Sequence, residues 1–212
     1  MNTNLLSEAE AEQLQQLIAE SKHIVICAHK SPDGDAMGAS LAWKSYLNQI
    51  GKTDVTVCMP DAFPDFLQWL PGSNTVLRYD KNPERVQEAF DKADLVCCVD
   101  FNQYMRVDAM QPTLVGCKAK RILIDHHLEP ETNNDITVSR PNMSSTSEMV
   151  FYIISQLGGY EDMSKDCAQC IYCGMMTDTG GFTYNSTRPE IYFVIGQLLS
   201  KGIDKDSIYN RV

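Results

Sequence analysis

The sequence of 212 residues has no apolar run that approaches the roughly 20 residues needed to cross a bilayer. No positively charged stretch followed by an apolar segment opens the chain, so a secretory leader is not expected. These absences argue against membrane insertion and predict a cytoplasmic protein that binds no membrane.

Basic residues are also scarce. The chain has 18 Lys and Arg against 28 Asp and Glu, which gives a formal net charge of −10. A surface of that sign is unsuited to binding long DNA or RNA through many phosphates. A small anionic substrate is still compatible with it, because local cations, including bound metal, outweigh the net charge at contact distance.

Several catalytic and structural motifs are missing. The chain has no Gly-x-Ser-x-Gly nucleophile elbow and no Gly-rich loop with Lys of the nucleoside triphosphatase type. Its eight cysteines lie mostly inside apolar runs, and the spacing Cys167-x-x-Cys170-x-x-Cys173 lacks the fourth cysteine of an iron–sulfur site. We therefore expect reduced, buried thiols and a packed helix at that position rather than disulfides or a cluster.

Strand-like runs rich in Val, Ile and Cys alternate with helix-like segments through the first part of the chain. The runs are "HIVICA", "DVTVCM", "TVLRY", "DLVCCVD" and "KRILIDHH", and the segments between them are 36–49, 64–70, 83–92 and 103–111. A capped helix is predicted before them at 7–20, and a short "DITVS" strand and helical patterns near 145–157, 163–177 and 188–201 come after them. This order predicts an α/β fold: a parallel, doubly wound sheet flanked by helices, with a helical second half.

The first predicted strand ends at His29 and leads into a turn that contains Asp33 and Asp35. The turn itself needs only the Pro-Asp-Gly part, so His29 and Asp35 are additional to it. Convergent imidazole and carboxylate groups suit a divalent cation, although an ordinary solvated loop is the alternative for this cluster alone.

Two other predicted strands end in residues of the same kinds, at Asp100 and at Asp125-His126-His127. Because the carboxyl ends of parallel strands meet at one edge of a sheet, these side chains and His29 are expected to lie together. Asp178 ends a helical pattern just before two glycines, which by itself is ordinary turn chemistry. Its significance depends on the other three clusters.

Together these clusters form four ordered motifs, "AHKSPDGDAMG", "VDFN", "DHH" and "TDTGGF", within residues 24–184. In this the sequence resembles the DHH phosphoesterases, named for the Asp-His-His at 125–127. The "SSTSE" and "TDTGGFTYNSTRP" segments look most like the oligoribonuclease and pAp-phosphatase branch, the nanoRNases. Family II inorganic pyrophosphatases share much of the same metal pattern.

The resemblance implies a two-metal phosphoesterase that hydrolyses short oligoribonucleotides and also adenosine 3′,5′-bisphosphate, by attack of a hydroxide that bridges the metals. Two alternatives stay open. One is a pyrophosphatase-like hydrolase, and the other is a metal-binding module that is inactive without a second domain.

The family's metal ligands can be carried onto matching positions. The resemblance implies that His29 and Asp33 bind one ion, that Asp35, His126 and Asp178 bind the other, and that Asp100 bridges both. Four aspartates would repel one another without compensation, and two divalent ions supply the matching positive charge. Carboxylate and imidazole donors suit Mn²⁺, with Co²⁺, Mg²⁺ or Zn²⁺ as substitutes.

The resemblance also implies that His127 faces the scissile phosphate as a catalytic group. Asp125 is expected to orient a neighbouring imidazole, or else to cap the strand end.

Three residues are candidates for substrate binding. Ser145 stands at capping-box spacing from Glu148, so it either caps a helix or opens a helix N-terminus that holds a phosphate. Tyr184 and Arg188 come after the fourth motif, and Arg188 is equally typical of a surface helix start.

Members of the family carry a smaller second domain after a linker, with a glycine-rich, histidine-containing segment. Nothing like that segment occurs before Val212. We therefore expect residues 1–200 to form the catalytic domain and residues 201–212 to begin a linker to an absent second domain. The sequence does not set the oligomeric state.

Overall fold

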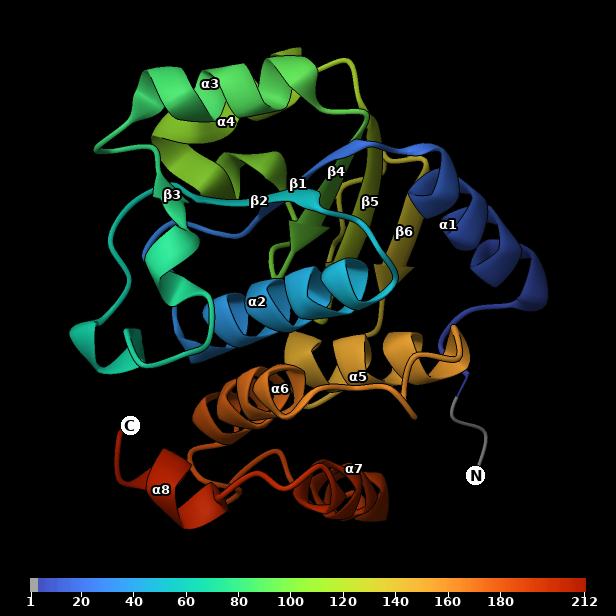
Figure 1. Ribbon diagram of the computed structural model, residues 1–212, viewed down its shortest axis with the longest axis vertical. Coiled ribbons are helices and arrows are strands. Elements are labelled where there is room, and N and C mark those ends of the chain that lie inside the picture. The colour runs from blue at the N-terminus through green and yellow to red at the C-terminus, as the bar shows by residue number, and fades with distance from the viewer. Residues whose placement is uncertain (1–3) are drawn as a thin grey trace.

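The computed structural model describes residues 4–212 and contains a six-stranded sheet with helices on both faces (Figure 1). All neighbouring strands are parallel, in the order β3-β2-β1-β4-β5-β6. The strands are β1 His23–Cys27, β2 Asp54–Met59, β3 Leu77–Arg78, β4 Leu95–Val99, β5 Lys120–Asp125 and β6 Ile136–Ser139. The predicted doubly wound α/β fold is confirmed.

The helices follow the predicted alternation. They are α1 Glu8–Glu20, α2 Gly34–Gln49, α3 Pro83–Lys92, α4 Gln111–Gly116, α5 Thr146–Gln156, α6 Lys165–Asp178, α7 Pro189–Ser200 and α8 Lys205–Tyr209, with 3₁₀ segments η1 Asp65–Leu67, η2 Ser73–Thr75 and η3 Tyr104–Met110. Helix α1 begins at the predicted capping box of Ser7 and Glu10. Across residues 4–212, every helix is too short or too polar to cross a bilayer.

Two predicted helices and one predicted strand are shorter or tighter than expected. Residues 64–70 form only the single turn η1, and Leu70 just before a proline cannot extend it. Residues 103–111 are mostly the 3₁₀ segment η3, because Asp108 takes φ 46° and ψ −122°, outside any helix. The "TVLRY" run pairs with β2 over two residues only.

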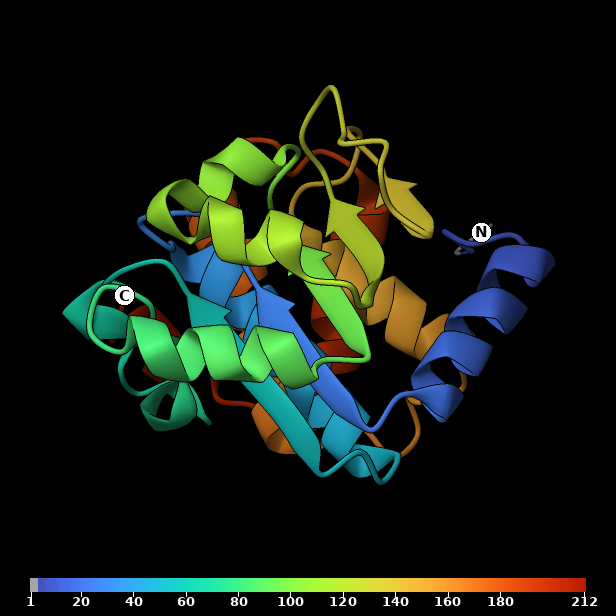
Figure 2. The same ribbon diagram turned by 90° about the horizontal axis from the view of Figure 1, so that it is seen from above.

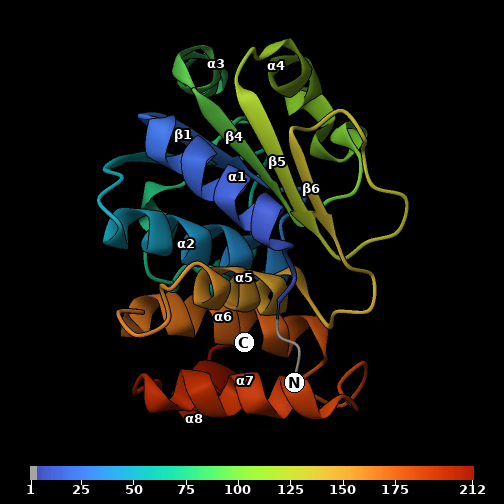
Figure 3. The same cartoon turned by 90° about the vertical axis from the view of Figure 1, so that its right-hand side faces the viewer.

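Apolar side chains face both sides of the sheet, as buried parallel strands require. Along β1, Ile24 and Ile26 join the core under α2 and α5, while Val25 and Cys27 join the smaller core under α3 and η3. Figure 2 shows α3 and α4 covering the second face, and Figure 3 shows α2 and α5 on the opposite side.

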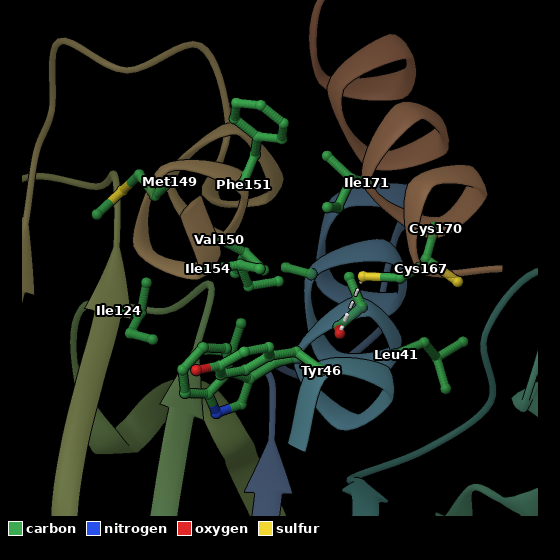
Figure 4. Packing of buried hydrophobic residues seen from close by; sticks show 14 of the residues in the cluster. Leu41, Tyr46, Ile124, Met149, Val150, Phe151, Ile154, Cys167, Cys170 and Ile171 are labelled. Carbon is green, nitrogen blue, oxygen red and sulfur yellow. Dashed lines mark hydrogen bonds between the residues drawn. The ribbon is translucent and has the colours of Figure 1, made fainter. Parts of the chain in front are cut away.

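Helices α6 and α7 form further layers outside α2 and α5 (Figure 3). Side chains of three helices interlock there, among them Tyr46 of α2, Val150 and Ile154 of α5 and Ile171 of α6 (Figure 4). The three regularly spaced cysteines lie in α6, and all eight cysteines are free thiols. The prediction of a packed helix at this position is confirmed.

The last residues of the chain also contact this layer. Ile203 and Ile208 are buried in the main core, and Ile208 belongs to α8. The prediction that residues 201–212 lead into a second domain is not tested by these contacts.

Two glycines allow α2 and α6 to cross at very short range. A Cβ on Gly38 would lie 2.5 Å from the Cys170 carbonyl oxygen and 3.0 Å from Cα of Gly174. A Cβ on Gly174 would lie 1.9 Å from Oγ of Ser147 and 2.9 Å from a carboxylate oxygen of Asp35. Helices α2, α5 and α6 therefore meet at very short range. The start of α2 and the end of α6 lie next to each other as a result.

This crossing predicts opposite effects for two Gly→Ala substitutions. Gly38→Ala should lower the free energy of unfolding by about 1–3 kcal/mol, because the added methyl collides with backbone. Gly196→Ala, in α7 with nothing within 4 Å of its Cβ position, should be neutral or raise it by up to about 1 kcal/mol. Urea unfolding midpoints measure both, and equal effects would contradict the account of the crossing.

Candidate active site

The candidate site lies where the strand connections diverge. From β1 the chain continues outward to β2 and β3, and β4, the other neighbour of β1, leads to β5 and β6 on the opposite side. Ligands of open α/β sheets bind in the crevice beyond the carboxyl ends of the strands at such a switch point. His29 follows β1 and Asp100 follows β4, so both stand at this crevice.

Asp100 holds a strained position at the end of β4. Its φ is +62°, a left-handed conformation that costs a non-glycine residue about 1–3 kcal/mol and that Asp and Asn tolerate better than most. Its backbone N–H donates to the Ile124 carbonyl at 3.0 Å, and Thr146 Oγ1 donates to its Oδ1 at 2.8 Å. These bonds from β5 and α5 hold the carboxylate in place.

Asp35 lies at the N-terminus of α5, although it belongs to α2. Its two oxygens accept from the backbone N–H groups of Thr146 at 2.6 Å and Ser147 at 2.8 Å, and the residue is 1% exposed. The free amides and positive dipole end of α5 therefore stabilise this buried anion. Asp33 caps α2 itself, because its Oδ1 accepts from the N–H groups of Asp35 and Ala36.

Asp178 is the last residue of α6. A carboxylate at a helix C-terminus meets the negative end of the helix dipole, so this position is unfavourable for an anion unless a cation lies nearby.

Both inward-facing imidazoles have one nitrogen fixed by backbone. His29 Nδ1 lies 2.7 Å from the Lys30 carbonyl oxygen, and His126 Nδ1 lies 3.3 Å from the Met143 carbonyl oxygen. A carbonyl accepts only from N–H, so the proton of the neutral ring sits on Nδ1 and leaves Nε2 with a free lone pair. This is the tautomer that a metal ligand needs.

The Nε2 atoms and the carboxylates form two adjoining groups that Asp100 connects. His29 Nε2 lies 3.8 Å from Asp33 Oδ2 and 3.5 Å from Asp100 Oδ2. His126 Nε2 lies 3.3 Å from Asp178 Oδ2, 3.7 Å from Asp100 Oδ1 and 3.9 Å from Asp35 Oδ2. The ligand atoms of His29, Asp33 and Asp100 lie within 4.8 Å of one another, as do those of Asp35, His126 and Asp178. Carboxylate oxygen with imidazole nitrogen is a donor set that divalent cations accept.

The negative charges of this cluster are costly, because the carboxylates are buried and repel one another. Burial, and then the nearby Asp35, raise the pKa of Asp178 to about 7 and the pKa of Asp100 well above its usual range. Burial lowers the pKa of His29, but Asp100 and Asp33 outweigh it and raise that pKa to about 10. Protons thus supply part of the neutralisation that a bound divalent cation would supply instead.

His127 stands beside these groups with its own carboxylate partner. Its Nδ1 lies 2.6 Å from Asp125 Oδ1, and its backbone N–H donates to Asp125 Oδ2 at 3.0 Å. Asp125 is fully buried, and its hydrogen bond raises the pKa of His127. Asp125 therefore orients an imidazole, as one of its two sequence-based alternatives predicted, and that imidazole is the ring of His127.

The three candidates for substrate binding are placed differently. Ser145 is fully buried, and its side-chain oxygen accepts from the Glu148 N–H, so Ser145 caps α5. The alternative prediction, an exposed phosphate site at this helix end, was wrong because Asp35 accepts the hydrogen bonds of the amides there. Arg188 donates to both oxygens of buried Glu148 at 2.6 Å. Tyr184 is 59% exposed and packs over Gly180. A role for Tyr184 or Arg188 in binding stays a prediction.

Sequence reasoning missed three contacts. These are the bond from Thr146 to Asp100, the bonds from the α5 amides to Asp35, and the glycine contacts where α2 crosses α6. The spacing of Gly34 and Gly38, one helical turn apart on α2, is the signal that could have indicated the crossing. Nothing in the sequence pairs Thr146 with Asp100.

Known proteins resemble this chain in sequence and in fold. The model of the "DHH family, N-terminal domain" matches residues 23–175. The bifunctional oligoribonuclease and PAP phosphatase NrnA of Thermus thermophilus is 29% identical over 192 residues, which cover 89% of this chain and 53% of that protein. The chain therefore spans about half the length of that relative.

Two solved structures extend the comparison. An exopolyphosphatase-related protein from Bacteroides fragilis superposes with a TM-score of 0.95 at 49% identity, over 97% of this chain and 60% of that one. Exonuclease RecJ bound to manganese superposes with a TM-score of 0.53 at 17% identity, over 93% of this chain and 49% of that one, which shows a shared fold.

The charge deficit predicts that a divalent cation stabilises the protein. Mn²⁺ at about 100 times its dissociation constant should raise the melting temperature by roughly 5–10 °C, and a chelator should reverse this. Asp100→Asn, which keeps a side chain tolerant of positive φ, should lose most of the response, whereas the exposed Asp162→Asn should keep it. A full response in Asp100→Asn would show that the cation binds elsewhere.

Proposed function

The chain belongs to the DHH family, and from this premise we propose that it is a metal-dependent phosphoesterase acting on short oligoribonucleotides and on adenosine 3′,5′-bisphosphate. The observation that carries the proposal is the pair of ligand groups joined by Asp100, with the His127–Asp125 pair at their side. The name of the Thermus relative supports the choice of substrates.

The proposed metal ligands follow from the two groups. His29, Asp33 and Asp100 would hold one ion, and Asp35, His126 and Asp178, again with Asp100, would hold the second. Two divalent ions balance the four carboxylates, and Mn²⁺ is the proposed ion because the donors are oxygen and imidazole nitrogen and the RecJ neighbour was solved with manganese. Such ions supply Lewis-acid chemistry: they activate water as a nucleophile and polarise a phosphoryl oxygen.

The chain's own acid would be His127. Asp125 holds Nδ1 and raises the pKa of the ring, which favours the protonated form in which Nε2 can donate a proton to the leaving oxygen. His127 is within 4.8 Å of the ligand atoms of Asp100 and His126, so a phosphate at the ligand groups lies within its reach. Asp125 acts through His127 and is a positioning residue.

Asp125→Asn should therefore lower kcat by about 10²–10⁴-fold, because an amide neither holds the ring in the correct tautomer nor stabilises its charge. The increase in melting temperature on adding Mn²⁺ should be unchanged, since Asp125 is not a proposed ligand. Asp125→Asn combined with His127→Ala should be no slower than His127→Ala alone. Additive losses in the double variant would contradict the positioning role.

A substrate panel tests the proposal as a whole. With saturating Mn²⁺ and fixed salt, hydrolysis should be fastest on strands of about two to five nucleotides and fall steeply with length, because a body of net charge −10 offers few contacts to additional phosphates. Adenosine 3′,5′-bisphosphate should also be hydrolysed, and His127→Ala controls for contaminating nuclease.

The alternatives give distinct results on the same panel. Turnover of pyrophosphate alone would indicate a pyrophosphatase, and metal binding with no turnover would indicate a binding module. Equal rates on a long strand and a dinucleotide, both abolished in His127→Ala, would indicate a polymer exonuclease.

A further inference from the structure

A cavity of about 420 Å³ opens next to the end of α6, outside the two ligand groups. Its lining is mostly aromatic and apolar and comes from three segments: η1, the α6 end with the loop after it, and the C-terminal residues. The lining residues are Phe66, Met176, Thr177, Gly180, Gly181, Tyr209 and Val212. The volume falls within the roughly 300–1,000 Å³ of small-ligand pockets.

One wall of the cavity adjoins the segments that carry two sets of candidate metal ligands. Thr177 precedes Asp178 in the chain, and a Cβ on Gly34 would lie only 2.3 Å from Thr177 Oγ1, so the wall of the cavity touches the turn that carries Asp33 and Asp35. Figure 1 shows α8 and the C-terminus beside the same end of α6. Thr177 and the residues around it therefore separate the cavity from a phosphate at the ligand groups by a single layer of side chains and backbone.

Two exposed aromatic rings in the lining are held on anchored backbone. Phe66 is 45% exposed and precedes fully buried Leu67, and Tyr209 is 62% exposed and follows buried Ile208. The two segments are joined where the Arg211 guanidinium lies over the ring of Trp69, 5.2 Å from its centroid. Gly181, with φ +69°, lets Tyr209 approach, since a Cβ there would lie 3.1 Å from the tyrosine ring. The backbone that carries the rings is therefore anchored while the ring surfaces stay open.

From this arrangement, and resting on the proposed function, we infer that the cavity is a subsite for the nucleobase attached to the phosphate at the ligand groups. Flat apolar ligands stack on aromatic rings, and a base one sugar away from the phosphate is the part of a nucleotide that is flat and only weakly polar. The occupant is thus a nucleobase and not a second phosphate.

The same lining predicts weak discrimination between bases. The Thr177 hydroxyl already donates to the Cys173 and Gly174 carbonyls. The other side chains of the lining are two aromatic rings, the thioether of Met176 and the aliphatic side chain of Val212, and none of them is charged. Stacking tolerates every base because every base has a π face. Purines should bind somewhat better than pyrimidines through their larger area.

Direct binding tests the subsite without depending on turnover. In the presence of Mn²⁺, calorimetry should show that adenosine 5′-monophosphate binds about tenfold or more tightly than ribose 5-phosphate, which lacks only the base. The Phe66→Ala/Tyr209→Ala variant should lose this advantage, with ribose 5-phosphate binding unchanged. Tyr209→Phe should keep it, because the ring remains.

Phe193→Ala is the matched control, because Phe193 lies on α7 and is 45% exposed, as Phe66 is. It should keep the full advantage of the base, and melting curves should show that all variants fold. Equal binding of the two phosphates by the wild type, no measurable binding of the nucleotide, or an advantage that survives in the double variant would overturn the inference. A base-dependent advantage in a protein that hydrolyses no nucleotide would instead retain the subsite and refute the proposed phosphoesterase function.

Discussion

Repulsion among buried carboxylates is the constraint on which this structure depends. Asp35 and Asp100 are almost fully buried, Asp33 and Asp178 lie against them, and a low-dielectric setting makes their mutual repulsion costly. The fold offsets part of this cost with fixed donors: the amides of α5 on Asp35 and the hydroxyl of Thr146 on Asp100. The remainder is left to protons or cations, and the carboxylate and imidazole groups together form a donor set suited to divalent metal.

The fold keeps these groups together by close packing of the helices that carry them. The glycine contact between α2 and α6 lets two helices meet at backbone distance, and the ligand atoms of Asp178 of α6 and Asp35 of α2 lie within 4.8 Å of each other. The sheet supplies the other groups by topology, since its switch point sets β1 and β4 side by side and aligns His29 with Asp100. Ligands from five different elements or their ends therefore converge without any long loop.

The sequence was sufficient for the features that periodicity and strand ends determine. Val- and Ile-rich runs predicted the parallel strands, and the residues after them predicted which side chains meet, because topology brings strand ends to one edge. It was insufficient where contacts join distant segments. The local capping pattern at Ser145 predicted either a helix cap or a phosphate site. It could not decide between them, because Asp35, the occupant of that helix end, lies 111 residues before Thr146 in the chain. The helical pattern of 103–111 likewise did not reveal that Asp108 interrupts the segment with a non-helical backbone.

Anomalous diffraction at the manganese edge, on crystals of the full chain grown with Mn²⁺, tests the central claim most directly. The account predicts two peaks, one between His29, Asp33 and Asp100 and the other between Asp35, His126, Asp178 and Asp100, with an Asp100 oxygen ligating each ion. A single peak, or peaks that do not contact Asp100, would contradict the claim that this carboxylate cluster is built for a pair of divalent ions.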